Sequence, residues 1–348
     1  MNLWLIIGIP VGLLALWALG FYALCMKMAQ FFMYPDRPKR QLAESWYTGH
    51  ESLGTPQTVD LVAADGRTPL RGIWYPHPAS TTGATLVLCH GVTSYKEECL
   101  TLAHVAHDLG YSTFLIDFRG HGESGGRYST LGLEEVDDLR AVVDWVALQQ
   151  GVNPARIGLL GHSMGAVTIL RYLAEYDIPI PFAIIMAPFA SLDRALFQRL
   201  SVMRVPFRPA RRLMLGFTQR AIQRDIFENV PLNIVDSIRE TALCYAHGLR
   251  DRGNHPNDSR DLHAATRVEK ELHWIPDAGH HALLQDIHMA TVVRDYAGRW
   301  MERFVAEDLA EPSRDPEDRA RAVGDEESAG DPVDERMGRE LDQPLTHR

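Results

Sequence analysis

The stretch "RIGLLGHSMGAVTIL", Arg156 to Leu170, places a serine between two glycines, where one sequence pattern gives way to another. Residues 156–163 form a mainly apolar run typical of a buried strand, and residues 164–176 have a helical pattern. Small residues at 161 and 165 would let the chain turn sharply, so that the Ser163 hydroxyl stands at the carboxyl edge of a sheet. A glycine-rich turn that contains a serine by chance would look the same, so the rest of the sequence must distinguish the two.

The middle of the chain alternates between strand and helix patterns. Short apolar or β-branched runs occur at 84–91, 111–120, 156–163, 182–188, 242–248 and 270–276. Helical patterns occupy 99–110, 133–151, 164–176 and 280–304, while 58–77 has the pattern of an antiparallel strand pair that turns at Asp65 and Gly66. Strands that are apolar on both faces and alternate with helices predict an α/β fold, with a mainly parallel central sheet flanked by helices.

Two later motifs supply the partners that a nucleophilic serine needs, a base and an acid that orients it. Asp251 follows the run 242–248 in "HGLRD", and His280 follows the run 270–276 in "DAGHH". Because loops at the carboxyl edge of a parallel sheet converge, Ser163, Asp251 and His280 are expected to meet, in the chain order typical of this architecture. The backbone N–H of Met164 is expected to stabilise an oxyanion, with Val92 as the second donor.

Five segments carry a resemblance to a known family: "LCHGVTSYKE" (88–97), "DFRGHGESGG" (117–126), "GLLGHSMGA" (158–166), "HGLRD" (247–251) and "DAGHH" (277–281). In order and spacing, residues 58–305 resemble the α/β-hydrolase superfamily. Within that superfamily, the chain resembles the membrane-anchored α/β-hydrolase-domain proteins, since they pair an N-terminal span with linkers such as "FFMYPDRP" (31–38). The resemblance implies cofactor-free acyl transfer to water through a serine acyl-enzyme. It assigns Ser163 as nucleophile, His280 as base, Asp251 as its partner, and Val92 and Met164 as oxyanion donors.

Neighbouring residues offer alternatives for two of these roles. His281 could replace His280, although the family motif places the base directly after glycine, and Asp258 or Asp261 could replace Asp251 from farther along the chain. Other polar residues near strand ends are expected to shape or brace loops: His90, Asp117, Arg119, His121 and His162. No histidine pair has H-x-x-x-H spacing on a plausible helix with an acidic partner, so we expect neither a metal nor another cofactor.

The N-terminal end of the chain is strongly apolar. Leu3 to Met26 is a run of 24 residues without a charged side chain, long enough to cross a bilayer. We expect residues 1–27 to be an uncleaved transmembrane anchor rather than a signal peptide, because no basic segment precedes the run and no clear cleavage site follows it. Four basic residues between 27 and 40 follow the run, so the positive-inside rule favours a cytoplasmic catalytic domain.

The C-terminal end is acidic. Residues 306–348 carry 14 acidic and 6 basic side chains, which account for most of the formal net charge of −10. This composition, rich in proline and glycine, predicts a disordered and solvated tail. Nothing in the charge distribution suggests a nucleic-acid partner. The four cysteines have no disulfide or C-x-x-C pattern, and two lie in apolar runs as core residues do.

An insertion at about 193–239 interrupts the alternation of strands and helices. Eight arginines lie in it among Phe, Leu and Met: Arg194, Arg199, Arg204, Arg208, Arg211, Arg212, Arg220 and Arg224. Two interpretations fit: ordinary helices with a solvated basic face, or a helical cap over the active site that faces a membrane or an acyl substrate. We therefore expect an anchor at 1–27, a linker at 28–57, a hydrolase domain at 58–305 and a tail at 306–348.

Serine at the turn favours esterase, lipase, thioesterase or peptidase chemistry over that of relatives that use aspartate or cysteine there. We expect a hydrolase of carboxylic esters, acyl lipids or thioesters, because an anchored domain with a basic, apolar cap meets amphiphilic substrates readily. A serine peptidase is the main alternative, but it would need acidic residues for a substrate amino terminus. A catalytically silent binding protein with this fold is a third hypothesis, which the filled Ser, His and Asp positions disfavour.

Overall fold

An eight-stranded sheet in the order β1-β2-β4-β3-β5-β6-β7-β8 forms the centre of the computed structural model. β1 (Gln57–Val62) and β2 (Pro69–Tyr75) pair antiparallel, and β2 pairs antiparallel with β4 (Ser112–Asp117). All remaining pairs are parallel, among β4, β3 (Thr85–Cys89), β5 (Ile157–His162), β6 (Phe182–Met186), β7 (Ala242–Gly248) and β8 (Lys270–Ile275). The mainly parallel α/β sheet expected from the sequence is confirmed.

The structure describes residues 3–34, 51–176, 178–202, 207–222, 224–225, 227–228 and 230–310. The expected linker therefore lies in large part outside the described residues, as does almost all of the expected tail. Residues up to Phe304 form one compact unit and residues from Val305 onward a second. The domain boundaries expected from the sequence remain predictions.

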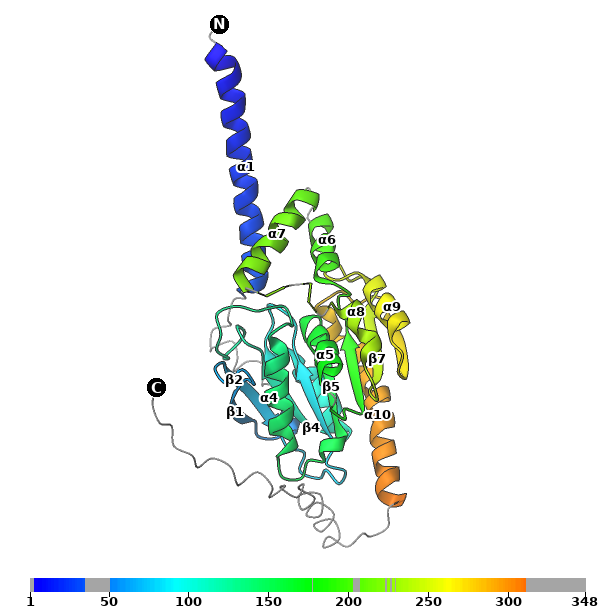
Figure 1. The fold of residues 1–348 in the computed structure, drawn as a ribbon. Helices are drawn as coiled ribbons and strands as arrows, with labels where there is room; N and C mark the ends of the chain where they lie inside the picture. The colour runs from blue at the N-terminus through cyan, green and yellow to red at the C-terminus, as the bar shows by residue number, and fades with distance from the viewer. Residues whose placement is uncertain are drawn as a thin grey trace, which may run out of the picture. The chain divides into compact units, whose positions relative to one another are not determined.

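Helices cover both faces of the sheet (Figure 1). One face packs against α4 (Glu135–Ala147), α5 (Met164–Glu175), α8 (Pro231–Ile234) and α9 (Pro256–Ala265), and the other against α3 (Leu100–Asp108) and α10 (Ile287–Ala310). Since successive side chains of a strand point to opposite faces, both sets must be apolar. Val87 thus joins the core on the α4 and α5 side, and Leu88 the core on the α3 and α10 side.

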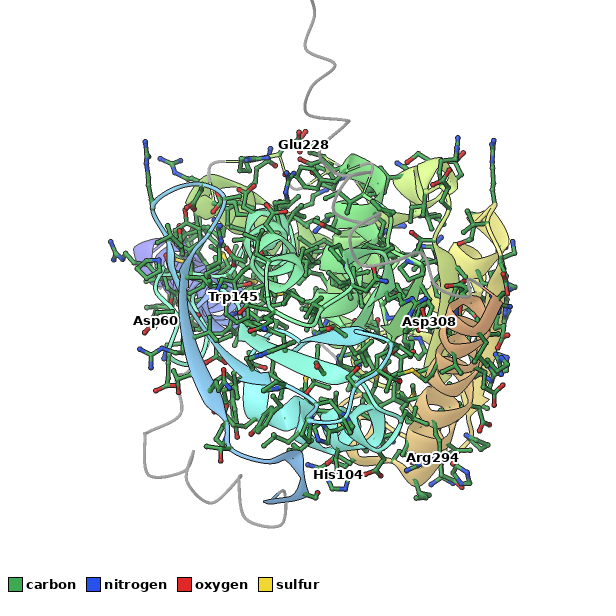
Figure 2. All side chains as sticks on the ribbon, turned by 90° about the horizontal axis from the view of Figure 1, so that it is seen from below. Asp60, His104, Trp145, Glu228, Arg294 and Asp308 are labelled. Carbon is green, nitrogen blue, oxygen red and sulfur yellow. The ribbon has the colours of Figure 1, made fainter. Side chains whose placement is uncertain are left out.

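Two contacts fix the helices to the sheet and to each other, and Figure 2 labels one residue of each, Trp145 and Arg294. Trp145 of α4 packs on Trp74 of β2 and Phe114 of β4, with ring centroids 6.0 and 5.4 Å apart. On the other face, Arg294 of α10 forms an ion pair with Asp108 at the end of α3, with a distance of 3.3 Å. The aromatic contacts thus fix α4 to the sheet, and the ion pair joins the two helices of the opposite face.

The insertion between β6 and β7 is helical, as expected of a cap. It contains α6 (Leu192–Val202) and α7 (Phe207–Ile222), followed by α8. Leu196 and Leu200 of α6 and Met214 of α7 form a small apolar cluster with Cys25 and Met28 of the N-terminal helix. The cap therefore has its own core, separate from the two cores of the sheet.

The N-terminal helix α1 (Leu3–Met33) is long and apolar. Its segment Ile7–Gln30 contains an 18-residue stretch with a mean hydropathy of 2.0, of which 6% is buried, a length and composition shared by membrane spans and signal sequences. The helix continues past the expected end of the anchor at residue 27, and its last turns contact the cap. Packing of Met33 beside Ile222 of α7 explains the extra turns.

Candidate active site

The turn between β5 and α5 presents Ser163 at the carboxyl edge of the sheet. Ser163 has φ of 53° and ψ of −110°, a strained conformation for a residue with a side chain. Two glycines make room for the turn. A Cβ on Gly161 would lie 2.6 Å from the backbone nitrogen of Ala166, and one on Gly165 would overlap the carbonyl of Cys89 on β3. Both small residues around the serine are thus required by close backbone approach.

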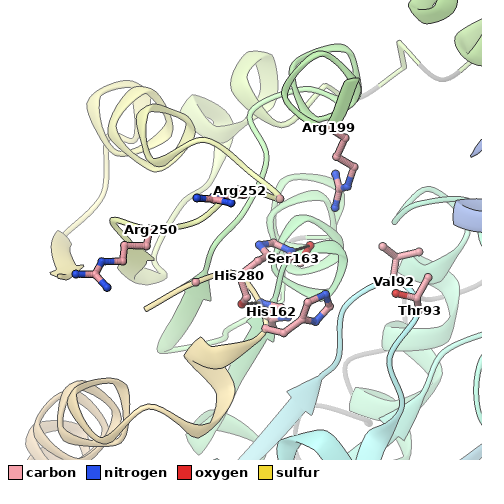
Figure 3. Close-up of a pocket in the computed structure, with 11 residues that line it drawn as sticks. Val92, Thr93, His162, Ser163, Arg199, Arg250, Arg252 and His280 are labelled. Atoms are coloured by element: carbon pink, nitrogen blue, oxygen red, sulfur yellow. Dashed lines mark hydrogen bonds between the residues drawn. The ribbon is translucent and has the colours of Figure 1, made fainter. Parts of the chain in front are cut away.

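Ser163, His280 and Asp251 form a hydrogen-bonded chain (Figure 3 shows Ser163 and His280 side by side). His280 Nε2 lies 3.0 Å from Ser163 Oγ, and His280 Nδ1 lies 2.7 Å from Asp251 Oδ2. A carboxylate only accepts hydrogen bonds, so Nδ1 carries the proton and Nε2 of the neutral ring accepts from the serine hydroxyl. His280 can therefore take the serine proton.

Asp251 is fixed by more than His280. The loop after β7 turns back on the carboxylate, so that the backbone N–H groups of Gly253 and Asn254 donate to Oδ1 at 2.7 and 2.9 Å. His247, the sixth residue of β7, places Nε2 3.2 Å from Oδ2. Burial by itself would raise the pKa of Asp251, but hydrogen bonds from His247 and His280 outweigh it and lower that pKa. The acid is ionised at neutral pH.

His280 is a weaker base than a free imidazole. Burial lowers its pKa most, the hydrogen bond and charge of Asp251 oppose that effect, and the charges of Arg199 and His281 lower the pKa further. Its ring lies beside that of His162, with centroids 4.8 Å apart and the planes tilted by 48°, and His162 Nε2 lies 2.9 Å from the His280 carbonyl oxygen. At neutral pH the ring is therefore in the neutral form that accepts a proton.

The two expected oxyanion donors lie on either side of Ser163. Met164 is the first residue of α5, where a backbone N–H has no partner within the helix. Val92 lies in the loop after β3 and lines the same cavity as Ser163. A Cβ on Gly91 would come within 3.3 Å of the Ser163 Cβ, which shows how close this loop approaches the serine. Both residues therefore stay candidates for the oxyanion role.

A cavity of about 470 Å³ opens above the serine. Its described wall contains three arginines and no carboxylate: Val92, Thr93, His162, Ser163, Arg199, Arg250, Arg252, Gly253, Gly279, His280 and His281. Figure 3 shows Val92 and Thr93 on one side of Ser163 and Arg252 on the other. Ser163 is only 2% exposed, so a substrate would reach it through this cavity.

Known proteins resemble this chain in sequence or in fold. A family model described as serine aminopeptidase, S33, matches residues 80–244. The uncharacterized protein YqkD of Bacillus subtilis is 33% identical over 204 residues, which are 58% of this chain and 66% of YqkD. The lysophosphatidylserine lipase ABHD12 of Bos taurus is 30% identical over 146 residues, 40% of this chain and 36% of that protein. The chain thus spans less than two thirds of either curated relative.

A solved structure, the esterase Pf2001 of Pyrococcus furiosus, superposes with a TM-score of 0.60 at 24% identity, covering 77% of this chain and 99% of its own. The chain belongs to the α/β-hydrolase superfamily. The superfamily resemblance stated from the five motifs is therefore confirmed, together with the fold class. The superposition bears on the fold, whereas the chemistry rests on the residues of this chain.

The alternative candidates have other contacts. Asp258 and Asp261 both pair with Arg194 of α6, while Asp251 contacts His280. His281 lines the cavity beside His280, with ring centroids 5.3 Å apart. The five residues expected to shape or brace loops contact neighbouring segments: His90 bonds to Gly91 and Phe118, Asp117 to Lys96, Arg119 to Asp138 of α4, His121 to the Arg119 carbonyl, and His162 to the His280 carbonyl.

Two residues of the site, His247 and Arg199, were not predicted from the sequence. His247 supports Asp251 from the strand itself, and Arg199 of α6 reaches the cavity from the cap. His247 is part of the "HGLRD" motif, four residues before the acid, which was the available signal. Arg199 is one of eight arginines in the insertion, and only the folded chain distinguishes it from the others.

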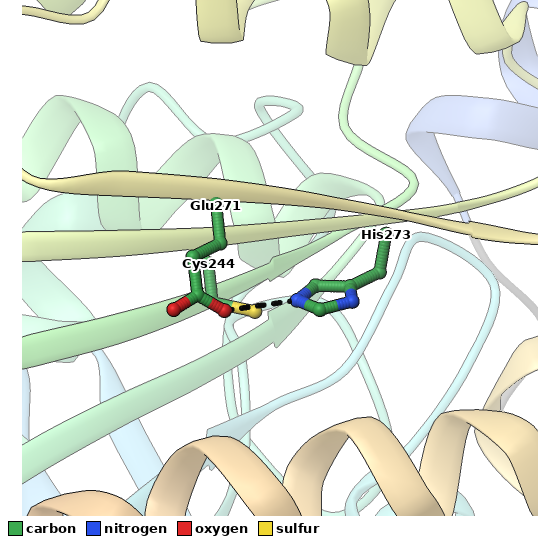
Figure 4. Close-up of side chains that lie close together, drawn as sticks. All are labelled: Cys244, Glu271 and His273. Atoms are coloured by element: carbon green, nitrogen blue, oxygen red, sulfur yellow. Dashed lines mark hydrogen bonds and ion pairs between the residues drawn. The ribbon is translucent and has the colours of Figure 1, made fainter.

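A second group of ligating side chains lies at the far edge of the sheet. Cys244 of β7 and Glu271 and His273 of β8 bring ligand atoms within 4.8 Å of one another (Figure 4). Glu271 already accepts from His273 at 3.0 Å and from Arg299 of α10 at 2.6 Å. Burial raises the pKa of the Cys244 thiol, which disfavours the thiolate that binds metals. An ion-pair cluster therefore describes this group better than a metal site.

Proposed function

We propose that this chain is a serine hydrolase of carboxylic esters with Ser163 as nucleophile. Ser163 Oγ attacks the ester carbonyl while its proton passes to His280 Nε2. The resulting imidazolium is stabilised by Asp251. The oxyanion accepts hydrogen bonds from the backbone N–H groups of Met164 and Val92. Collapse breaks the ester C–O bond, the His280 proton goes to the leaving oxygen, and water then cleaves the acyl-enzyme with the same base.

The observation that carries this proposal is the hydrogen-bonded chain at the cavity floor. Ser163 to His280 at 3.0 Å and His280 to Asp251 at 2.7 Å are distances at which a proton can move without rearrangement. The lowered pKa values of Asp251 and His280 support the ionised acid and neutral base that the reaction needs. The strained turn at Ser163 is consistent with selection for the position of its hydroxyl.

We place the substrates among acyl lipids or related amphiphilic esters, including thioesters. The apolar helix α1 contacts the cap that covers the cavity, so an embedded helix would bring the cap close to lipid. The name of ABHD12, a lysophosphatidylserine lipase matched over 146 residues, agrees with a monoacyl lipid.

An aminopeptidase is the second candidate, since the matching family model is described as serine aminopeptidase. Such an enzyme binds a protonated amino terminus, and a carboxylate would be needed to pair with it. The cavity residues described here include three arginines and no acid. Their charge repels an ammonium group, so we rank the peptidase below the esterase.

The test is hydrolysis of a chain-length series of p-nitrophenyl esters by the full chain in detergent, beside leucine p-nitroanilide. Ester turnover should fall about 10⁴-fold or more in Ser163→Ala and be kept in Ser201→Ala, which removes an exposed hydroxyl of α6 that donates to the Phe197 carbonyl at 2.8 Å. Anilide turnover above ester turnover would favour the peptidase. Folded protein without turnover of either would favour a silent binding protein.

We also propose that α1 anchors the enzyme with its catalytic domain on the cytoplasmic side. The basic residues that follow the uncharged run Leu3 to Met26, from Lys27 onward, support that orientation by the positive-inside rule. Protease treatment of sealed vesicles tests it. A C-terminal tag should be cleaved in inside-out vesicles and protected in right-side-out ones, and the reverse pattern would contradict the assignment.

A further inference from the structure

Helix α6 of the cap places Arg199 at the cavity that contains Ser163. Ala195 and Arg199 lie four residues apart, so they share one face of the helix. Ala195 is buried against Val167 of α5, which directs this face toward the hydrolase domain. Figure 3 shows Arg199 reaching from its helix toward Ser163, while Arg250 and Arg252 extend to the other side. Arg199 is therefore the arginine of the cavity that is aimed at the serine.

The position of Arg199 is linked to the catalytic loop. Its Nη1 lies 3.4 Å from Oδ1 of Asn254, a fully buried side chain. Asn254 is fixed in turn, because its Nδ2 donates to the Ala187 carbonyl at 2.8 Å and its backbone N–H donates to Asp251. The guanidinium thus faces the cavity from a defined position, with donors in the fork geometry that suits phosphate or carboxylate.

The other two arginines of the cavity are placed differently. Arg250 is 72% exposed and pairs with Asp277 at 2.7 Å, and Arg252 is exposed at the mouth. Burial lowers the pKa of Arg199 to about 10, so its charge is present at neutral pH in a partly desolvated place. An anion reaching such a site gains more than it would from an arginine in open solvent.

We propose that Arg199 binds a phosphate carried on the alcohol part of the substrate, so that the enzyme prefers acyl esters of phosphorylated glycerol over their neutral counterparts. This inference rests on the proposed ester hydrolysis and names the charged group that the site would select. Arg199 is then a specificity residue, and Ser163, His280 and Asp251 perform the same steps on either substrate.

The test compares 1-hexanoylglycerol 3-phosphate with 1-hexanoylglycerol, using the full chain in a neutral detergent. The two esters share acyl chain and leaving oxygen, and the short chain keeps both monomeric. We expect the wild type to favour the phosphate ester about tenfold or more in kcat/KM. Arg199→Gln should lose most of that ratio, and Arg199→Lys should keep part of it. Arg194→Gln, which removes the same charge from the same helix outside the cavity, should keep the wild-type ratio.

Several outcomes would overturn the proposal. Equal kcat/KM for the two esters in the wild type would remove the phosphate preference while leaving ester hydrolysis intact. An equal loss on both esters in Arg199→Gln would assign Arg199 a structural or pKa-tuning role instead. If Arg199→Gln does not fold, an unchanged ratio in Arg199→Lys would count against the proposal. Failure of wild type to exceed Ser163→Ala on either ester would overturn the proposed function and this inference together.

Discussion

Ser163 meets two requirements that conflict, since its side chain must carry a hydroxyl while its backbone adopts a conformation that favours glycine. Its φ of 53° with ψ of −110° costs about 1–3 kcal/mol for a residue with a Cβ. The surrounding chain maintains this conformation, because the Ser163 N–H donates to the Met186 carbonyl of β6 at 2.8 Å and Gly165 packs on β3. The strain is thus local and should be measurable.

Replacing Ser163 by glycine should therefore stabilise the fold relative to alanine. Glycine relieves the strained φ but loses about 0.5–1 kcal/mol to the greater freedom of the unfolded chain. We expect Ser163→Gly to unfold about 2 °C above Ser163→Ala in a thermal scan. The two variants lack the same hydroxyl, so both should be inactive and only stability should differ. A lower Tm for the glycine variant would show that the turn is not strained.

The pH dependence of kcat/KM should report His280. Its pKa is lowered, so the neutral base persists to lower pH than for a free imidazole, and activity falls as pH drops through that pKa. Arg199→Gln removes a positive charge that lowers this pKa, so the acidic limb should move to higher pH. Arg194→Gln is the matched control and should leave the limb in place. A limb unmoved in both variants would mean that Arg199 does not act on His280.

At this scale the sequence predicted most of the candidate site. Ser163, Asp251 and His280 could be placed because each follows a strand, and parallel strands deliver their exits to one edge. Arg199 could not be placed, because it depends on how a helix of the cap packs on α5, a tertiary contact without local signature. His247 was missed because a residue within an apolar strand pattern is normally assigned to the core.

Helix α6 has two different faces. Leu196 and Leu200 pack in the cluster with Cys25 and Met28 of α1, whereas Ala195 and Arg199 face the hydrolase domain. The C-terminal end of α1 therefore contributes side chains to the apolar core of the cap, while much of the rest of the helix is exposed and apolar. The apolar run Leu3 to Met26 could be predicted from the sequence, whereas the continuation of the helix to Met33 depends on its packing against the cap, which composition does not show.

Removing the last turns of α1 should loosen the cap. A chain without residues 1–21 keeps Cys25, Met28 and Met33, and a chain without residues 1–33 exposes the side chains that they cover. Each buried apolar side chain contributes roughly 1.5–3 kcal/mol. We expect trypsin to cleave after Arg211 or Arg212 of α7 about tenfold faster or more in the shorter chain. Equal cleavage rates would show that α1 does not support the cap.

On the scale of the whole molecule, the chain has an apolar N-terminal segment and an acidic C-terminal segment in its sequence. The middle of the chain carries little net charge and forms the packed domain. The segment Ile7–Gln30 exposes large apolar side chains, with Leu16 at 67% and Leu19 at 64% exposure. Such a surface is costly in water and is matched by lipid. The α/β layers, the cap and the apolar N-terminal helix could all be predicted from the sequence, whereas membrane insertion still needs an experiment.

The full chain should remain in the membrane pellet after extraction with alkaline carbonate. A double variant, Leu16→Arg with Leu19→Arg, places two charges near the middle of the segment, at a cost of about 2.5–3.5 kcal/mol each. It should shift a large share of the protein to the supernatant. Leu148→Arg, at a position 84% exposed beyond the end of α4, adds a charge elsewhere and should not. Release of the wild type would contradict an integral anchor.

Because one face of α6 packs on α1 and the other faces the hydrolase domain, this helix connects α1 to the cavity. With α1 embedded, a bilayer of different thickness would change its tilt, and Leu196 and Leu200 would pass that movement to the helix that carries Arg199. Ser163, His280 and Asp251 follow the strands β5, β8 and β7 and would keep their geometry. Membrane thickness would then change the preference between esters more than the rate of the chemical step. The substrate selectivity of the protein would therefore depend on the surrounding lipid.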